Sequence, residues 1–185
     1  EYLKIKYEKP GNAYLGIVHR IDRPTSGIVM FAKTSKALSR MNSMFKNQEV
    51  EKLYWAITQN KPDDKAGKLI HWLRKNPKNN KSTHFLKETN NAKRAALSYR
   101  ILKTLENYYL LEIKMESGRH HQIRCQLQAI GCTIKGDIKY GSKRTNPDGS
   151  IDLHARNLKF IHPVTKKEIN ITAPVREEKI WKSCI

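Results

Sequence analysis

The chain has 185 residues, enough for one domain with a sizeable core, and we expect residues 1–185 to form that single domain. Its 36 lysine and arginine residues against 17 aspartate and glutamate residues give a formal net charge of +19, which favours a polyanionic partner such as nucleic acid over a merely basic surface. Three widely spaced cysteines without a CxxC pair argue against a zinc site and a disulfide framework, and no apolar run is long enough to span a membrane.

The two ends of the chain give few further signals. No signal peptide is visible, which predicts a cytoplasmic protein with free thiols. Residue 1 is glutamate rather than methionine, so we expect an amino-terminal piece to precede the printed sequence. A monomer is the default expectation for the oligomeric state.

The first part of the chain predicts two strands with a helix between them. Residues 28–32 are β-branched, apolar or aromatic, and predict a buried strand. Thr34 or Ser35 can cap a helix that continues through about Asn47, whose apolar stripe would pack on the sheet. Residues 53–58 predict a second strand with alternate side chains on opposite faces.

The middle of the chain predicts a loop followed by a hairpin. Residues 75–82 are polar, basic and rich in turn formers, and predict an exposed loop. That loop is equally consistent with a solvated connection and with a flexible arm that contacts phosphate. Residues 95–105 and 108–115 alternate in polarity and predict the two strands of a hairpin.

The last third of the chain predicts a helix and a second hairpin. Apolar residues keep helical spacing within 122–130, and Gly131 is well placed as a left-handed terminator. Residues 153–161 and 168–172 predict a carboxyl-terminal hairpin. Strands with a few helices and no internal repeat predict a single α+β domain on a mixed, largely antiparallel sheet.

Residues 19–27 read His-Arg-Ile-Asp-Arg-Pro-Thr-Ser-Gly and set one carboxylate among basic side chains. Opposite charge within a few ångströms favours the ionised form of a carboxyl group. We therefore expect Asp22 to be available as a nucleophile or a base across the cellular pH range.

Residues 117–124 read Ser-Gly-Arg-His-His-Gln-Ile-Arg, at the predicted junction between a strand and a helix. A helix amino terminus presents free N–H groups to phosphate, so Arg119, His120 and Gln122 suit contact with a nucleic-acid backbone. Arg124 lies two residues into the helix, where an inward side chain would need a carboxylate partner. Asp22 is the obvious candidate for that partner.

The paired histidines invite a metal interpretation, with His154 and Asp137 as further ligands. Adjacent positions at a helix start diverge by about 100°, which does not suit chelation of one ion, so we expect no metal site. Hydrogen bonding at the helix start is the favoured role for His120 or His121, and a structural role is favoured for His154. No GxxxxGK[ST], strand-linked GxGxxG or GxSxG motif occurs, which argues against nucleotide hydrolysis, a dinucleotide cofactor and acyl transfer.

These motifs resemble those of the RluA-like RNA pseudouridine synthases. The family signature HR-[LI]-D-x-x-T-S-G matches residues 19–27, and the form G-R-x-H-Q-[IL]-R matches residues 118–124. Weaker matches follow at residues 52–56, 136–141 and 153–163, in the family's order. One departure is His120, which stands where threonine or serine is common.

The resemblance implies the pseudouridine synthase domain, a curved, mixed, largely antiparallel sheet with flanking helices and a central cleft. It also implies isomerisation of uridine to pseudouridine in flipped-out bases of ribosomal or transfer RNA, without cofactor or metal. No S4-type RNA-binding domain precedes the catalytic region in the printed sequence.

The resemblance also implies roles for individual residues. Asp22 is then the catalytic aspartate, which attacks C1′, adds to C6 or removes the 2′ proton. Arg124 pairs with Asp22, and Tyr54 stacks on the uracil and can remove the C5 proton. Arg20 fills the vacated space or holds a phosphate, while Leu153 packs under the base or simply within the core. An RNA-binding protein without catalysis and a metal-dependent nuclease are the rival interpretations, and the nuclease lacks clustered carboxylates.

Overall fold

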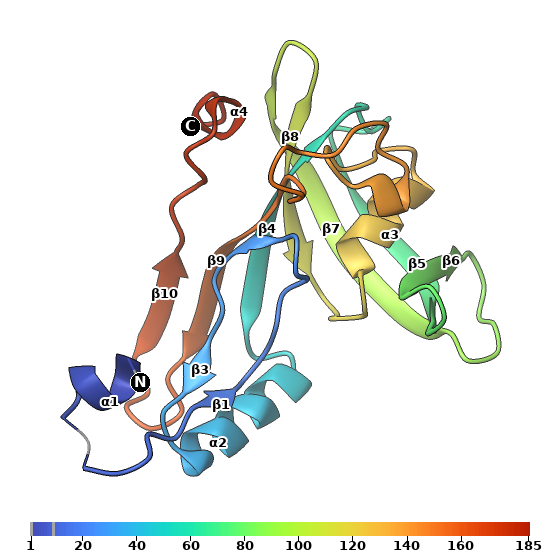
Figure 1. The fold of residues 1–185 in the computed structure, drawn as a ribbon. Helices are drawn as coiled ribbons and strands as arrows, with labels where there is room; N and C mark the ends of the chain where they lie inside the picture. Colours follow the sequence, from blue (N-terminus) through green and yellow to red (C-terminus); the bar gives the residue numbers. More distant parts are fainter. Residues whose placement is uncertain (1, 9) are drawn as a thin grey trace.

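The computed structural model describes residues 2–8 and 10–185, and one long sheet dominates it (Figure 1). The strands of this sheet run in the order β10, β9, β4, β8, β7, β5, β6, and β2 pairs with β9. All neighbours are antiparallel except β2 and β9, which are parallel. The predicted α+β class with a mixed, largely antiparallel sheet is therefore confirmed. The strands are β2 (Ser26–Gly27), β4 (Glu51–Thr58), β5 (Ala66–Asn76), β6 (Lys81–Phe85), β7 (Lys93–Thr104), β8 (Tyr109–Met115), β9 (Leu153–Ile161) and β10 (Glu168–Thr172).

Short elements surround this sheet. A separate two-stranded sheet is formed by β1 (Gly16–Ile17) and β3 (Phe31–Ala32). The helices are α1 (Tyr2–Lys6), α2 (Ser35–Lys46), α3 (Gln122–Ala129), the 3₁₀ helix η1 (Ile138–Tyr140) and α4 (Lys179–Lys182). Among the described residues, no helix has the length and apolar content to cross a membrane.

Helix α2 begins where the sequence predicts it. Thr34 has extended backbone, and its hydroxyl accepts a hydrogen bond from the Ala37 N–H at 3.1 Å, which satisfies one of the free donors of the first turn. Met41 and Met44 then face β9, where they pack in one cluster with Leu158. The apolar stripe of the helix thus buries itself against the sheet.

The predicted buried strand at residues 28–32 is wrong in extent. Only Phe31 and Ala32 form a strand, and Phe31 is 47% exposed. Ile28 and Met30 pack against the α2 cluster, whereas Val29 and Phe31 are exposed. The segment is therefore two-sided, because successive side chains of extended backbone point in opposite directions.

The predicted loop at residues 75–82 is also wrong, because β5 and β6 extend into it from both sides. Only residues 77–80 are left as a turn between the two strands. The side chains of Asn76 and Asn79 build this turn by accepting hydrogen bonds from the N–H groups of Lys78 and Lys81, at 3.0 and 3.1 Å. Such local bonds are typical of asparagine in turns.

The main core lies between one face of the sheet and helix α3. Ile123 and Leu127 of the helix pack in one buried cluster with Ala56 of β4, Leu111 of β8 and Leu153 of β9. The helix has the predicted bounds within one residue, and Gly131 follows it in left-handed conformation with φ +72°. The packing of Ile123 and Leu127 on the sheet thus fixes the amino-terminal end of α3 over it.

The opposite face of the sheet is covered by the carboxyl terminus. Ile57 and Leu110 pack there against Trp181 of α4, whose indole N–H donates to Asp152 Oδ1 at 3.0 Å. The alternation predicted for residues 53–58 is confirmed, because Ala56 faces the main core and Ile57 faces Trp181. The carboxyl-terminal hairpin has the predicted bounds.

The segment around Asp22 is pinned to β9 at Gly27. This glycine pairs with Ala155 in parallel register, has φ +111°, and lies so close that an added Cβ would be 2.6 Å from the Ala155 nitrogen and nearer still to its oxygen. On the other side of the motif, the Thr25 N–H donates to the Asp22 carbonyl at 2.8 Å. The chain between these contacts has little freedom to move.

We predict that Gly27→Ala lowers the free energy of unfolding by about 2–4 kcal/mol, because it adds a backbone clash to an unfavourable φ. Gly149→Ala is the matched control: its φ is +72° but its Cβ would meet nothing within 4 Å, so it should cost about 1 kcal/mol. Urea denaturation of the two variants measures the difference. Equal losses would contradict a close approach at Gly27.

Candidate active site

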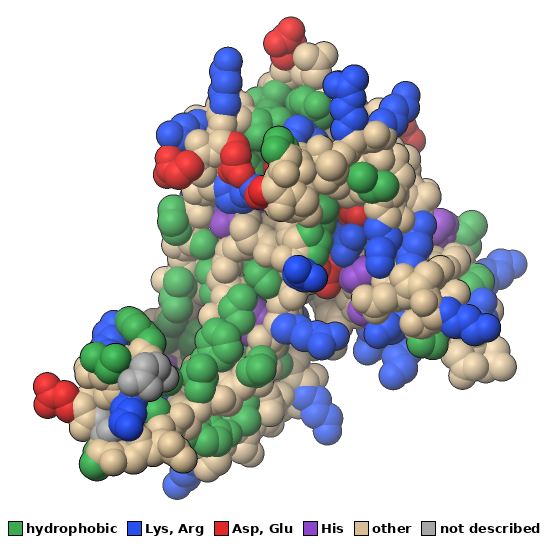
Figure 2. Space-filling model, viewed as in Figure 1, with side chains coloured by type: hydrophobic (Ala, Val, Ile, Leu, Met, Phe, Trp, Pro, Cys, Tyr) green, Lys and Arg blue, Asp and Glu red, His purple; other side chains and the backbone are tan. Residues whose placement is uncertain are grey.

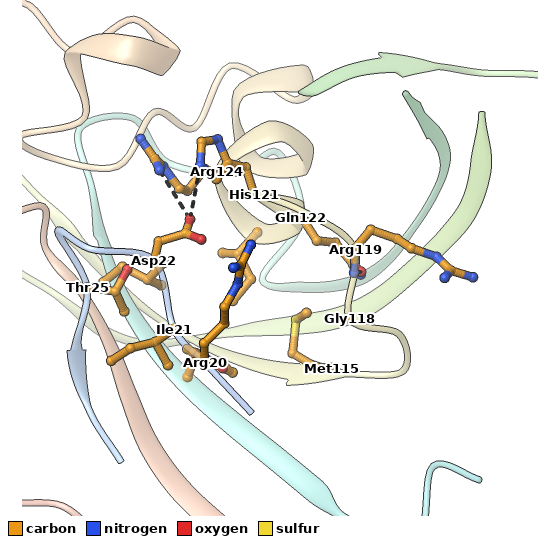
Figure 3. A pocket seen from close by; sticks show the side chains of 13 residues that line it. Arg20, Ile21, Asp22, Thr25, Met115, Gly118, Arg119, His121, Gln122 and Arg124 are labelled. Atoms are coloured by element: carbon orange, nitrogen blue, oxygen red, sulfur yellow. Dashed lines mark hydrogen bonds and ion pairs between the residues drawn. The ribbon is translucent and has the colours of Figure 1, made fainter. Parts of the chain in front are cut away.

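A cleft of about 120 Å³ opens where the Asp22 segment, β4, β9 and the start of α3 meet (Figure 3). The structure brings almost all the predicted site residues together there. Asp22 and Arg124 lie on its wall, and seven of the eight predicted site residues line it: Arg20, Asp22, Tyr54, Arg119, Gln122, Arg124 and Leu153. His120 is the exception and lines a neighbouring hollow.

Arg124 is the centre of an ion-pair network. Its Nη1 lies 3.1 Å from Asp22 Oδ2, so the pairing of these two residues that the sequence predicts is present (Figure 3). The same guanidinium donates from Nε and Nη2 to both oxygens of Asp137, at 2.7 and 2.8 Å. The side chains of Arg124 and Asp137 are buried, whereas that of Asp22 is 28% exposed.

The network keeps Arg124 charged although it is buried. Burial by itself lowers the pKa of the guanidinium, but the hydrogen bonds and charges of Asp137 and Asp22 outweigh this and raise it. The ionised arginine makes a charge-assisted hydrogen bond to Asp22 Oδ2. The exposed carboxylate of the network is thus the one that faces the cleft.

Asp137 is the residue of this network that sequence reasoning missed. Its place in the sequence suggested a metal ligand, but in the structure its carboxylate binds a guanidinium bidentately. The turn that leads into η1 holds Asp137 in place, because its carbonyl accepts from the N–H groups of Tyr140 and Ser142, both at 3.0 Å. One feature of the sequence could have indicated Asp137. A buried Arg124 requires compensating charge and hydrogen bonds, and Asp22 alone does not satisfy all its donors.

Tyr54 and Leu153 belong to the apolar part of the cleft, together with Ile21, Met115 and Ile123. Tyr54 comes from β4 and Leu153 from β9, and both also contact the main core. Burial and the charge of Asp22 together raise the pKa of Tyr54 to about 12, so its phenol is neutral at pH 7. The cleft therefore places a neutral aromatic side chain near a carboxylate.

The amide of Gln122 is engaged inside the protein. It accepts from the Arg119 N–H at 3.0 Å and from the Ser117 hydroxyl at 2.8 Å, and it donates to the Ala96 carbonyl at 3.0 Å. Gln122 is also 2% exposed. It lines the cleft, but this geometry gives it the task of holding the turn before α3 rather than of contacting a nucleic-acid backbone.

The hollow beside the cleft is basic. It has a volume of about 330 Å³ and is lined by Lys75, Lys93, Arg119 and His120, with Ser82 at the His120 ring. Lys and Arg side chains gather around α3 and the β5–β6 end of the sheet, with histidines between them (Figure 2). Arg20 and Arg119 are both exposed at the edge of the cleft. A strong positive potential therefore surrounds the partly exposed carboxylate of Asp22.

Two further polar side chains, His154 and Thr25, lie near the site. His154 is buried, and its Nδ1 lies 2.9 Å from the Ser26 hydroxyl, which is the structural role expected for it. Thr25 lines the cleft with a buried hydroxyl that has no hydrogen-bond partner in the described residues, and sequence reasoning did not single it out.

Within residues 2–8 and 10–185, His, Cys, Asp and Glu side chains form no group of three suited to a metal ion.

Comparisons with known proteins agree with this geometry. A family model described as RNA pseudouridylate synthase matches residues 2–129. The chain is 35% identical over 172 residues to ribosomal large subunit pseudouridine synthase C of Rickettsia felis, a match that covers 91% of this chain and 56% of that protein. For the protein of the same name from Vibrio cholerae the identity is 32% over 173 residues, with 90% and 54% covered. The chain thus spans about half the length of these relatives.

The fold is also that of solved structures. Human RNA pseudouridylate synthase domain containing 4 superimposes with a TM-score of 0.79 at 22% identity, over 98% of this chain and 78% of that one. Human RNA pseudouridylate synthase domain containing 1 gives a TM-score of 0.76 at 21% identity, over 98% and 76%. At these identities the likeness concerns the fold.

Proposed function

The chain belongs to the RNA pseudouridylate synthase family, and from this premise we propose that it isomerises uridine to pseudouridine in structured RNA at the cleft around Asp22. The observation that carries the proposal is the Asp22–Arg124 ion pair, which presents a carboxylate to a cleft with an aromatic wall and basic surroundings. A protein that only bound RNA would have no need of a carboxylate in that place, since the charge repels phosphate.

The reaction detaches uracil from C1′ of its ribose, turns the base and rejoins it through C5. The bond from C1′ to N1 breaks, the bond from C1′ to C5 forms, and the proton leaves C5 while N1 gains one. Atoms and electrons balance within the nucleotide, so the chemistry calls for no cofactor and no metal. The task of the protein is to stabilise the separated fragments and to hold them in place.

Asp22 is the group proposed to start the reaction. Arg124 contacts its Oδ2, and in the described residues no side chain or backbone donor bonds its Oδ1. Oδ1 is therefore the oxygen available to attack C1′, to add to C6 or to take the 2′ proton. Arg124 orients the carboxylate before substrate arrives, which lowers the cost of reorganisation during the reaction.

Tyr54 is proposed to stack on the uracil and to receive the C5 proton. Because its pKa of about 12 keeps the phenol neutral at rest, it first gives its own proton to N1 of the detached uracil and then receives the C5 proton. Leu153 beside it supplies apolar contact to the same base. Together they form a surface that suits a flat, uncharged heterocycle.

The substrate is proposed to be a flipped uridine held by its flanking backbone. A base within folded RNA must leave its stack, which costs a few kcal/mol that phosphate contacts have to offset. Arg20 at the cleft edge and the basic hollow with Arg119 and His120 are proposed to make these contacts. The names of the two bacterial relatives refer to the ribosomal large subunit, so ribosomal RNA is the first substrate to test, ahead of transfer RNA.

The activity is tested by the release of tritium from RNA labelled with 5-³H-uridine, since the C5 proton is lost in the reaction. We predict release by the parent and a loss of at least about 1,000-fold in Asp22→Asn, because the amide is no nucleophile and no base. RNA binding should persist in this variant, since a negative charge has been removed. Asp148→Asn, which changes an exposed aspartate paired with Arg176, should release tritium at the parental rate. Equal release from Asp22→Asn and the parent would contradict the proposal.

The basic hollow is tested by the salt dependence of RNA binding. We predict that the double substitution of Lys75 and Lys93 by alanine weakens binding and reduces the slope of log affinity against log salt concentration by about 1 to 2, because each lysine that neutralises a phosphate contributes about 0.7 to 0.9. Lys166 and Lys167 lie in the exposed β9–β10 turn, and their alanine double variant is the matched control. A similar slope for both double variants would show that the hollow does not hold RNA.

A further inference from the structure

We propose that His121 is a positioning residue for Asp22: its neutral imidazole points an Nε2–H at Asp22 Oδ2, in a tautomer that Tyr140 selects. This inference rests on the proposed function for its catalytic consequence, but the tautomer itself is a property of the free protein. From the sequence, His121 is expected only to form hydrogen bonds at the start of the helix.

The relevant contacts form one line from β6 to the cleft. The Ser82 N–H donates to the Tyr140 hydroxyl oxygen at 2.7 Å, and that oxygen lies 3.0 Å from His121 Nδ1. On the other side of the ring, His121 Nε2 lies 3.7 Å from Asp22 Oδ2 (Figure 3). His121 is thus the link between a buried tyrosine and the exposed carboxylate.

The direction of each hydrogen bond follows from the available donors and acceptors. The Tyr140 oxygen already accepts from the Ser82 N–H, so its own hydrogen is free to be donated. Two acceptors compete for it: His121 Nδ1 at 3.0 Å, and the Ser82 carbonyl, which is more distant at 3.4 Å and also accepts from the Cys125 thiol. The shorter contact is favoured, so His121 Nδ1 accepts the Tyr140 hydrogen. The ring hydrogen of His121 is then on Nε2.

Electrostatics favours the same tautomer. If Nδ1 carried the hydrogen, the lone pair of Nε2 would face the negatively charged Asp22 oxygen at 3.7 Å, which is repulsive. Burial lowers the pKa of His121 to about 4 and raises that of Tyr140 to about 12, so both groups are neutral at pH 7. A neutral imidazole with its hydrogen toward Asp22 avoids the burial of another charge beside Arg124.

The backbone of His121 is held in a conformation that serves this contact. His121 has φ 51° and ψ 30°, a left-handed conformation that costs energy in a residue with a side chain. From there its ring stacks on His120 at 3.8 Å between centroids and meets Tyr140 edge to face at 5.6 Å. The residue is 9% exposed, so neighbours on all sides define its orientation.

The contacts of His121 and Arg124 bear on which carboxylate oxygen of Asp22 faces the substrate. Arg124 and His121 both approach Oδ2 of Asp22, and in the described residues no hydrogen bond is formed to Oδ1. At 3.7 Å the His121 contact is longer than a hydrogen bond, and contacts of this kind tighten when substrate fills a site. The two donors together direct Oδ1 toward the substrate and stabilise the charge that remains on Oδ2.

The tautomer is tested by ¹⁵N NMR of the labelled protein without RNA, because protonated and unprotonated ring nitrogens have distinct signals. His121→Gln identifies the His121 signals by their loss. We expect the Nε2–H tautomer in the parent and a mixture of tautomers in Tyr140→Phe, which loses the hydroxyl and keeps the ring. Tyr99→Phe alters another buried tyrosine and should leave the tautomer unchanged. An Nδ1–H tautomer in the parent would overturn the proposal.

The catalytic consequence is tested by single-turnover tritium release together with RNA affinity. We expect about a tenfold slower turnover in Tyr140→Phe and about 100-fold in His121→Ala, with unchanged affinity. His121→Gln retains an N–H at the matching position and should recover much of the rate. Parental turnover in His121→Ala would overturn the positioning role. If the parent itself released no tritium from any RNA, the proposed function would fail, whereas the NMR result would still decide the tautomer.

Discussion

The arrangement of the site depends on one buried cation that two carboxylates share. Arg124 is 5% exposed, and a guanidinium in that position is tolerated only when charge and hydrogen bonds compensate it. Asp137 supplies both from a neighbouring turn, 13 residues away in sequence. The remaining Nη1 then reaches across to Asp22, which is 102 residues away. Three segments, the Asp22 loop, α3 and the turn before η1, are therefore fixed relative to one another by a single planar side chain.

The charges of the molecule separate binding from chemistry. Its overall charge is +19, yet beside the cleft the two carboxylates of Asp22 and Asp137 share the one buried guanidinium of Arg124, and His121 is neutral. Lys75 and Lys93 lie in the hollow beside the cleft, and Arg119 lines both the hollow and the cleft. In the proposed complex, phosphate is attracted to the surroundings, whereas the uncharged base faces a carboxylate and the aromatic ring of Tyr54. A flipped nucleotide has this same division between charged backbone and neutral base.

Much of the fold and part of the site could be predicted from local sequence signals. The Thr34 cap, the alternation in β4 and the bounds of the carboxyl-terminal hairpin depend on neighbouring residues, and these predictions are confirmed. The bidentate bond of Asp137 and the left-handed backbone of His121 depend on how distant segments meet. Helical spacing puts adjacent side chains far apart, but His121 precedes the helix, so its ring stacks on His120. The end of β5 and the start of β6 were not predicted within residues 75–82, because polar residues form both the turn and the adjoining strand ends there.

The central claim is that the planar fork of Arg124, and not only its charge, sets the orientation of Asp22. Arg124→Lys tests it most directly, because lysine keeps the positive charge but offers a single nitrogen that cannot bind Asp137 bidentately and still reach Asp22. With RNA labelled at C5 of uridine, we expect a folded variant that binds RNA like the parent and releases tritium at least about 100-fold more slowly. Release at the parental rate from the folded lysine variant would contradict the account.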